Sequence, residues 1–118
     1  MTEQEILNKV GIEQISIAKK DCKYPELVKF ADEKISLTES GNSNWNAEEI
    51  NDVLRFTGSE RIQFYDILGV VNKAICKLGK CISKQHLLDN KHRFRKSRDA
   101  GTYFRADVLL EIERIKNQ

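Results

Sequence analysis

The most distinctive region of this sequence is residues 91–104, Lys91-His92-Arg93-Phe94-Arg95-Lys96-Ser97-Arg98-Asp99-Ala100-Gly101-Thr102-Tyr103-Phe104. Five of its first eight residues are Lys or Arg, and aromatic residues stand at positions 94, 103 and 104. The segment Asp99-Ala100-Gly101 is typical of a turn, because these residue types accept the backbone angles that tight turns need. The region therefore predicts a basic β-hairpin over about 93–104. Such a hairpin suits a polyanionic partner, although a basic run is also typical of a solvated surface.

The composition is that of a helix-rich globular domain. The chain has 118 residues, of which 40% are hydrophobic and 32% charged, with one proline and six glycines. This length is sufficient for a hydrophobic core. No apolar run follows Met1, and no stretch approaches the ~20 apolar residues of a membrane span. We therefore expect a cytoplasmic protein with no membrane partner. Cys22, Cys76 and Cys81 are an odd number of cysteines in such a chain, which favours free thiols.

Apolar residues at helical spacing predict the remaining elements. We expect helices over 3–20, 26–35, 46–58, 60–78 and 83–88, and a last helix after Asp107; Gly11 could divide the first of them. Helix 60–78 is apolar over much of its surface and is the candidate central helix, while Trp45 is expected in the core. The predicted fold is a single mainly α domain, with five or six helices and one short C-terminal β-hairpin. Residues 1–44 would form an N-terminal helical extension and residues 45–118 a helix-turn-helix with a wing.

The order of elements after residue 60 resembles a known architecture. Helix 60–78 and helix 83–88 are joined by a short turn at Gly79, which is helix-turn-helix spacing. A basic strand at 94–98, a turn at Gly101, the aromatic pair Tyr103-Phe104 and the acidic helix start at Asp107 follow. This order resembles the wing of excisionase and MerR-type winged helices. The resemblance covers residues 60–118 and implies that 83–88 is the recognition helix and 91–98 the wing strand; residues 1–59 resemble no specific family.

The charges divide unevenly along the chain. Residues 1–70 carry 8 Lys or Arg against 13 Asp or Glu, a net charge of −5, whereas residues 71–118 carry 12 against 5, a net charge of +7. Such asymmetry favours a polyanionic partner for the basic half. The alternative is that the two halves attract one another, within a monomer or between protomers.

These observations predict a small DNA-binding accessory or regulatory protein of phage or plasmid type, acting in transcription or recombination. We expect no enzymatic activity and no cofactor, because the sequence has no Gly-rich phosphate loop, HExxH or GxSxG motif. A homodimer is expected, since one short recognition helix reads few base pairs. The candidate contacts to duplex DNA are Lys77, Lys80, Ser83, Lys84, Gln85, Lys91, Arg93, Arg95, Lys96 and Arg98. The arginines of the hairpin and Lys96 would hold phosphates or the minor groove, and residues 83–85 would approach the major groove.

Two alternatives remain open at this point. The protein could be an adaptor or inhibitor that places the basic hairpin on an acidic protein surface. Zinc is the second alternative, because Cys76, Cys81, His86 and His92 have the spacing C-x4-C-x4-H-x5-H. Cys76 lies inside the predicted central helix, which argues against the convergence of four ligands on one ion.

Overall fold

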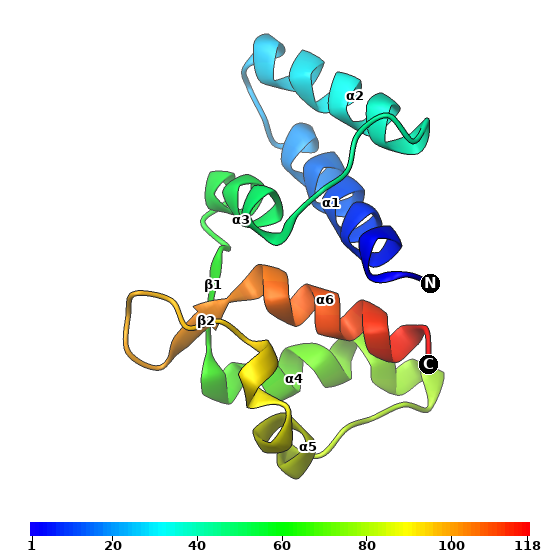
Figure 1. The fold of residues 1–118 in the computed structure, drawn as a ribbon. Coiled ribbons are helices and arrows are strands. Elements are labelled where there is room, and N and C mark those ends of the chain that lie inside the picture. Colours follow the sequence, from blue (N-terminus) through cyan, green and yellow to red (C-terminus); the bar gives the residue numbers. More distant parts are fainter. The chain divides into compact units, whose positions relative to one another are not determined.

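The computed structural model describes residues 1–118, and it contains six α-helices and one two-stranded antiparallel sheet (Figure 1). The predicted mainly α fold class is confirmed. No helix is both long and apolar enough to cross a membrane. The chain forms two compact units, unit 1 from Met1 to Gly58 and unit 2 from Ser59 to Gln118. The division thus falls after Gly58, whereas the N-terminal extension was expected to end at residue 44.

Unit 1 is built from three helices, α1 (Glu3–Lys20), α2 (Pro25–Glu39) and α3 (Ala47–Phe56). Capping residues fix where α1 and α3 begin, because Thr2 Oγ1 accepts the Glu5 N–H at 3.2 Å and the Asn46 side chain accepts an N–H of its first turn. Pro25 begins α2, where a missing N–H removes no helical hydrogen bond. Helix α1 packs against both α2 and α3.

Trp45 lies in the core of unit 1, as predicted. Its side chain is 3% exposed, and its indole N–H donates to Thr38 Oγ1 at 3.1 Å. Asn8 and Gln4 of α1 bind its backbone N–H and C=O, each at 2.8 Å. The ring lies against Gly11, where an added Cβ would stand 2.3 Å from Trp45 Cδ2. Helix α1 is continuous through Gly11, so this glycine makes room for the tryptophan and does not divide the helix.

Unit 2 follows the order β1 (Arg61–Gln63), α4 (Phe64–Ile75), the 3-10 turn η1 (Cys76–Leu78), α5 (Lys84–Asp89), the 3-10 turn η2 (Lys91–Arg93), β2 (Thr102–Phe104) and α6 (Arg105–Lys116). Residues 61–63 were expected to begin the central helix, and this was wrong. They form a strand that pairs antiparallel with β2, with Ile62 opposite Tyr103. Within this strand only Ile62 is buried, which is the alternation expected of a half-buried strand. Strand pairing thus outweighs the local helical spacing.

The core of unit 2 is centred on α4, which packs against α6. Ile67, Val71 and Ile75 of α4 are fully buried, so the predicted central role of this helix is confirmed. Helix α5 adds Leu87 and the sheet adds Ile62 and Tyr103. Phe94, Val108, Ile112 and Ile115 complete the cluster. The elements that carry the candidate site are therefore held by one continuous apolar core.

Candidate nucleic-acid interface

The basic hairpin forms, and we call residues 95–104 the wing. Ser97 N donates to Thr102 O at 2.9 Å, and Phe104 N donates to Arg95 O at 3.1 Å. A bridge between Lys96 and Tyr103 lies between these two bonds. Strand β2 therefore has β1 on one side and residues 95–97 on the other. In Figure 1 the tip of the wing is the orange loop that extends beyond the helices of unit 2.

Two of the predicted contact residues, Arg93 and Arg95, bind acidic side chains of α6. Arg93 NH1 lies 3.1 Å and 3.3 Å from the two carboxylate oxygens of Glu111. Arg95 forms a bidentate pair with Asp107, from Nε at 3.1 Å and from NH2 at 3.2 Å. Glu111 is 2% exposed and Asp107 is 5% exposed, so the burial of each carboxylate would be costly without a paired cation. Arg95 thus attaches the wing to α6, and Arg93 attaches η2 to the same helix.

A third predicted contact, Lys80, has a structural partner of its own. Its ammonium group donates to the main-chain oxygens of Ile115, Lys116 and Gln118 at 3.2, 3.0 and 2.9 Å. These carbonyls belong to the C-terminal end of α6, where the helix macrodipole is negative and carbonyls lack helical partners. Lys80 therefore caps α6.

Four of the predicted cations have exposed side chains that make no hydrogen bond or ion pair with another residue. They are Lys77, Lys84, Lys96 and Arg98. Arg98 stays free because its neighbour Asp99 is bound by Arg61 in an ion pair. Lys91 is also exposed, and its ammonium group lies 4.8 Å from the centre of the Phe64 ring. These five side chains are available to a partner.

Three of the available cations share one hollow. Lys91, Lys96 and Arg98 line a shallow depression on the wing, together with residues 97 and 99–103. The hollow thus has cationic residues of η2 and of the wing strand in its lining. The only acidic side chain of this lining is Asp99, which is already paired with Arg61. The arrangement is suited to an anion that has several charged oxygens.

The first turn of α5 has fewer free side chains for a DNA contact than the sequence predicted. Ser83 caps the helix by accepting the His86 N–H at 3.1 Å, and the Gln85 amide donates to Asp89 at 2.9 Å. Only Lys84 has a free, exposed side chain among the three residues expected in the major groove. Helix α5 has six residues, which is short for base reading. The predicted contacts that remain available are therefore Lys96 and Arg98 on the wing, together with Lys77, Lys84 and Lys91 outside it.

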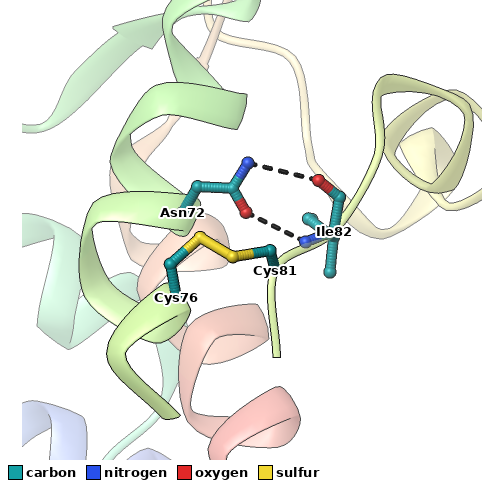
Figure 2. Close-up of a disulfide and its surroundings, with 4 residues drawn as sticks. All are labelled: Asn72, Cys76, Cys81 and Ile82. Carbon is teal, nitrogen blue, oxygen red and sulfur yellow. Dashed lines mark hydrogen bonds between the residues drawn. A yellow bond between two sulfur atoms is a disulfide. The ribbon is translucent and has the colours of Figure 1, made fainter. Parts of the chain in front are cut away.

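The cysteines were expected to be free thiols, and for two of them this was wrong. Cys76 and Cys81 form a disulfide across the turn at Gly79, as Figure 2 shows. Gly79 has a φ of 71°, and this left-handed turn brings the two Cα atoms to 4.5 Å. Cys22 alone has a free thiol. Sulfurs that are bonded to each other are not thiolate ligands, and no group of three or more His, Cys, Asp or Glu side chains is placed to hold a metal ion.

Comparisons of this chain with protein-family models, with curated proteins and with solved structures found no match. The functional argument therefore depends on the geometry of unit 2 itself.

Sequence reasoning missed three residues of this region. Arg61 was assigned to a helix, but it stands on β1 and binds Asp99 of the wing tip. Asp107 was expected only as the acidic start of the last helix, and Glu111 was given no role. Their spacing of four places them on one face of α6. Arg93 is the last residue of η2 and Arg95 begins the wing, so the sequence spacing of the two arginines does not show that both reach α6. The spacing of Asp107 and Glu111 was the one signal that could have indicated the ion pairs.

Proposed function

We propose that this protein binds duplex DNA through the wing and the free cations around α5, as a small accessory or regulatory factor. The observation that carries the proposal is the hollow on the wing, which is lined by Lys91, Lys96 and Arg98 and whose only acidic residue, Asp99, is paired with Arg61. Phosphate contacts of this kind position a protein on DNA and supply most of its affinity. The protein acts by binding and has no catalytic role of its own.

The arrangement of unit 2 supports the same proposal. Unit 2 has the element order of a winged helix-turn-helix. A strand is followed by two helices, then by a basic strand that pairs with a second strand, and finally by a helix. Unit 2 carries 13 Lys or Arg against 7 Asp or Glu, a net charge of +6, whereas unit 1 carries 7 against 11, a net charge of −4. A wing of such a unit can follow the DNA backbone, and Arg98 at its tip can enter a narrow minor groove.

The contact set that we propose is smaller than the set predicted from sequence. Lys77, Lys84, Lys91, Lys96 and Arg98 contact phosphates, while Lys80, Arg93 and Arg95 hold the fold of unit 2. With Lys84 as the one free side chain at the start of α5, binding depends mainly on the backbone and shape of the duplex. A homodimer on DNA is part of the proposal, because one such unit covers few base pairs. The proposed location is the cytoplasm.

The test is a fluorescence anisotropy titration of duplex DNA, single-stranded DNA and RNA at two salt concentrations. We expect duplex binding that weakens steeply with salt, by a log–log slope of about 0.9 per phosphate contact. Lys96→Ala/Arg98→Ala removes two of the contacts. Lys23→Ala/Lys29→Ala is the matched control, because it removes the same charge from two exposed lysines of unit 1. Absence of duplex binding by the wild type at low salt would exclude the proposal.

A protein-binding adaptor or inhibitor is the second candidate. The short α5 and the internal bonds of Ser83 and Gln85 favour it, because they leave little for sequence-specific base contacts. The free cations of the wing suit carboxylates of an acidic protein surface as well as phosphates. Pull-down from extract before and after nuclease treatment separates the two functions. A protein partner is retained after nuclease treatment, whereas a partner held through nucleic acid is lost.

A further inference from the structure

The disulfide between Cys76 and Cys81 occupies the connection that sets the position of α5. Cys76 is the first residue after α4, and Cys81 lies three residues before α5 begins at Lys84. The bond closes the chain around the left-handed turn at Gly79. Any change at this bond acts directly on the segment that places α5 relative to α4.

A second attachment holds the same connection without the sulfurs. The Asn72 amide of α4 donates to Ile82 O at 3.2 Å and accepts the Ile82 N–H at 2.9 Å (Figure 2). Lys80 is tied to the end of α6 by its three hydrogen bonds. Leu87, 3% exposed, attaches α5 to the core. These contacts do not depend on the sulfurs, so they can keep unit 2 folded when the disulfide is reduced.

The bond is also accessible to a reagent in solution. Cys81 is an exposed residue and Cys76 is half-buried. Disulfides of cytoplasmic proteins are usually transient and redox-sensing, because thiol reductants keep most cysteines reduced there. In the proposed cytoplasmic location, a disulfide that ends on an exposed cysteine fits that class better than it fits a purely structural bond.

We propose that this disulfide is a reversible redox switch: it holds α5 in place when oxidised and releases it when reduced, which lowers the affinity of unit 2 for DNA. The second half of the proposal rests on the proposed function.

The reductant is a dithiol. Its thiolate attacks one sulfur of the bond, a mixed disulfide forms, and the other cysteine leaves as a thiolate that takes up a proton. The second thiol of the reductant then displaces the remaining cysteine. Two electrons and two protons are gained by the protein, and the dithiol becomes a disulfide. A low-molecular-weight disulfide reverses the reaction.

The physical reason for the lower affinity is a smaller population of the binding-competent arrangement. Cross-linking a short loop removes conformational freedom that the reduced connection regains. If the reduced protein places α5 correctly for only a fraction of the time, its apparent affinity falls by that fraction. We expect a loss of roughly threefold to tenfold in duplex affinity, with Lys84 and Lys77 as the contacts whose positions become variable.

The experiment uses the full chain with Cys22→Ser, so that residues 76 and 81 carry the only sulfurs able to form a disulfide. The protein is studied oxidised with oxidised glutathione, reduced with dithiothreitol, and as a Cys76→Ser/Cys81→Ser variant. Hydrogen–deuterium exchange of the amides of α5 is measured together with duplex affinity. On reduction we expect faster exchange at Leu87 and Asn90, whose N–H groups bind Ser83 O and His86 O, and unchanged exchange in α4. The serine variant should match the reduced form and show no change with the reductant. Re-oxidation of the reduced cysteine protein should restore the exchange rates and the affinity of the oxidised form.

Equal exchange at α5 in the oxidised and reduced protein would overturn the switch, as would a serine variant that behaves like the oxidised form. Faster exchange with equal duplex affinity would overturn the regulation of binding. If neither redox state binds duplex DNA, the proposed function falls. The exchange measurement, which needs no ligand, then decides by itself whether the bond controls α5.

Discussion

Arg95 and Asp107 are joined twice, because the guanidinium of Arg95 forms a bidentate pair with the Asp107 carboxylate and the Arg95 backbone N–H donates to the same carboxylate at 2.7 Å. The side chain and the main chain of one wing residue are thus fixed by one buried acid of α6. The guanidinium carbon also lies 5.1 Å from the centre of the Phe104 ring, on the opposite strand of the wing. Arg95 therefore belongs to the basic residues that hold the wing in its fold, and not to those that are free to bind a partner.

Arg95→Ala should destabilise unit 2 by about 2 kcal/mol, because it leaves the Asp107 carboxylate buried without its cation. Arg98→Ala, its matched control on the same segment, should stay within about 0.5 kcal/mol of the wild type, because the Arg98 side chain is exposed and unpaired. Urea denaturation followed by NMR signals of unit 2 measures both, since the only tryptophan, Trp45, reports on unit 1. Equal stability of the two variants would contradict the assignment of Arg95 to the fold.

Gly11→Ala should destabilise unit 1 by about 2 kcal/mol or more, although alanine is the better helix former by about 1 kcal/mol. The new Cβ would stand 2.3–2.8 Å from atoms of the Trp45 ring, which is itself buried. Thermal unfolding followed by tryptophan fluorescence is the measurement. Gly69→Ala is the control, because Gly69 also lies inside a helix but has open space where its Cβ would be. That variant, followed by NMR signals of unit 2 because Trp45 reports on unit 1, should be as stable as the wild type or more so.

Lys80→Met should lower the stability of unit 2 by about 1 kcal/mol and leave the salt dependence of DNA binding unchanged. The reason is that its ammonium group binds three carbonyls at the end of α6 and does not face a partner. Lys84→Met is the comparison, since Lys84 is free and exposed. It should reduce the log–log salt slope by about 0.9 without a change in stability. A reduced slope for Lys80→Met would show that Lys80 contacts DNA after all.

Much of the fold follows from local patterns in the sequence. The starts of α1, α2 and α3, each predicted to within one residue, and the apolar surface of α4 depend on nearby residues, so periodicity was sufficient to predict them. Trp45 was placed in the core for its size and apolar surface. The features that were missed depend on contacts between distant residues. Strand β1 exists because β2 pairs with it.

The candidate site was less predictable than the fold, for the same physical reason. A list of basic residues does not reveal which of them have acidic partners, and the partners of Arg93 and Arg95 lie 18 and 12 residues away. The Cys76–Cys81 bond required the left-handed turn at Gly79, which the spacing of the cysteines alone does not establish. Composition therefore predicted a cationic unit, while three-dimensional contacts selected the cations available to a partner.

The measurement that tests the central claim most directly is the salt dependence of duplex affinity for the wild type and for Lys96→Ala/Arg98→Ala, with Lys23→Ala/Lys29→Ala as the charge-matched control. The account predicts that the wing variant loses on the order of tenfold in affinity at low salt and about 1.8 in log–log slope, while the control resembles the wild type. Equal losses in both variants would mean that net charge alone drives the interaction. That result, or no duplex binding by the wild type, would contradict a DNA-binding wing.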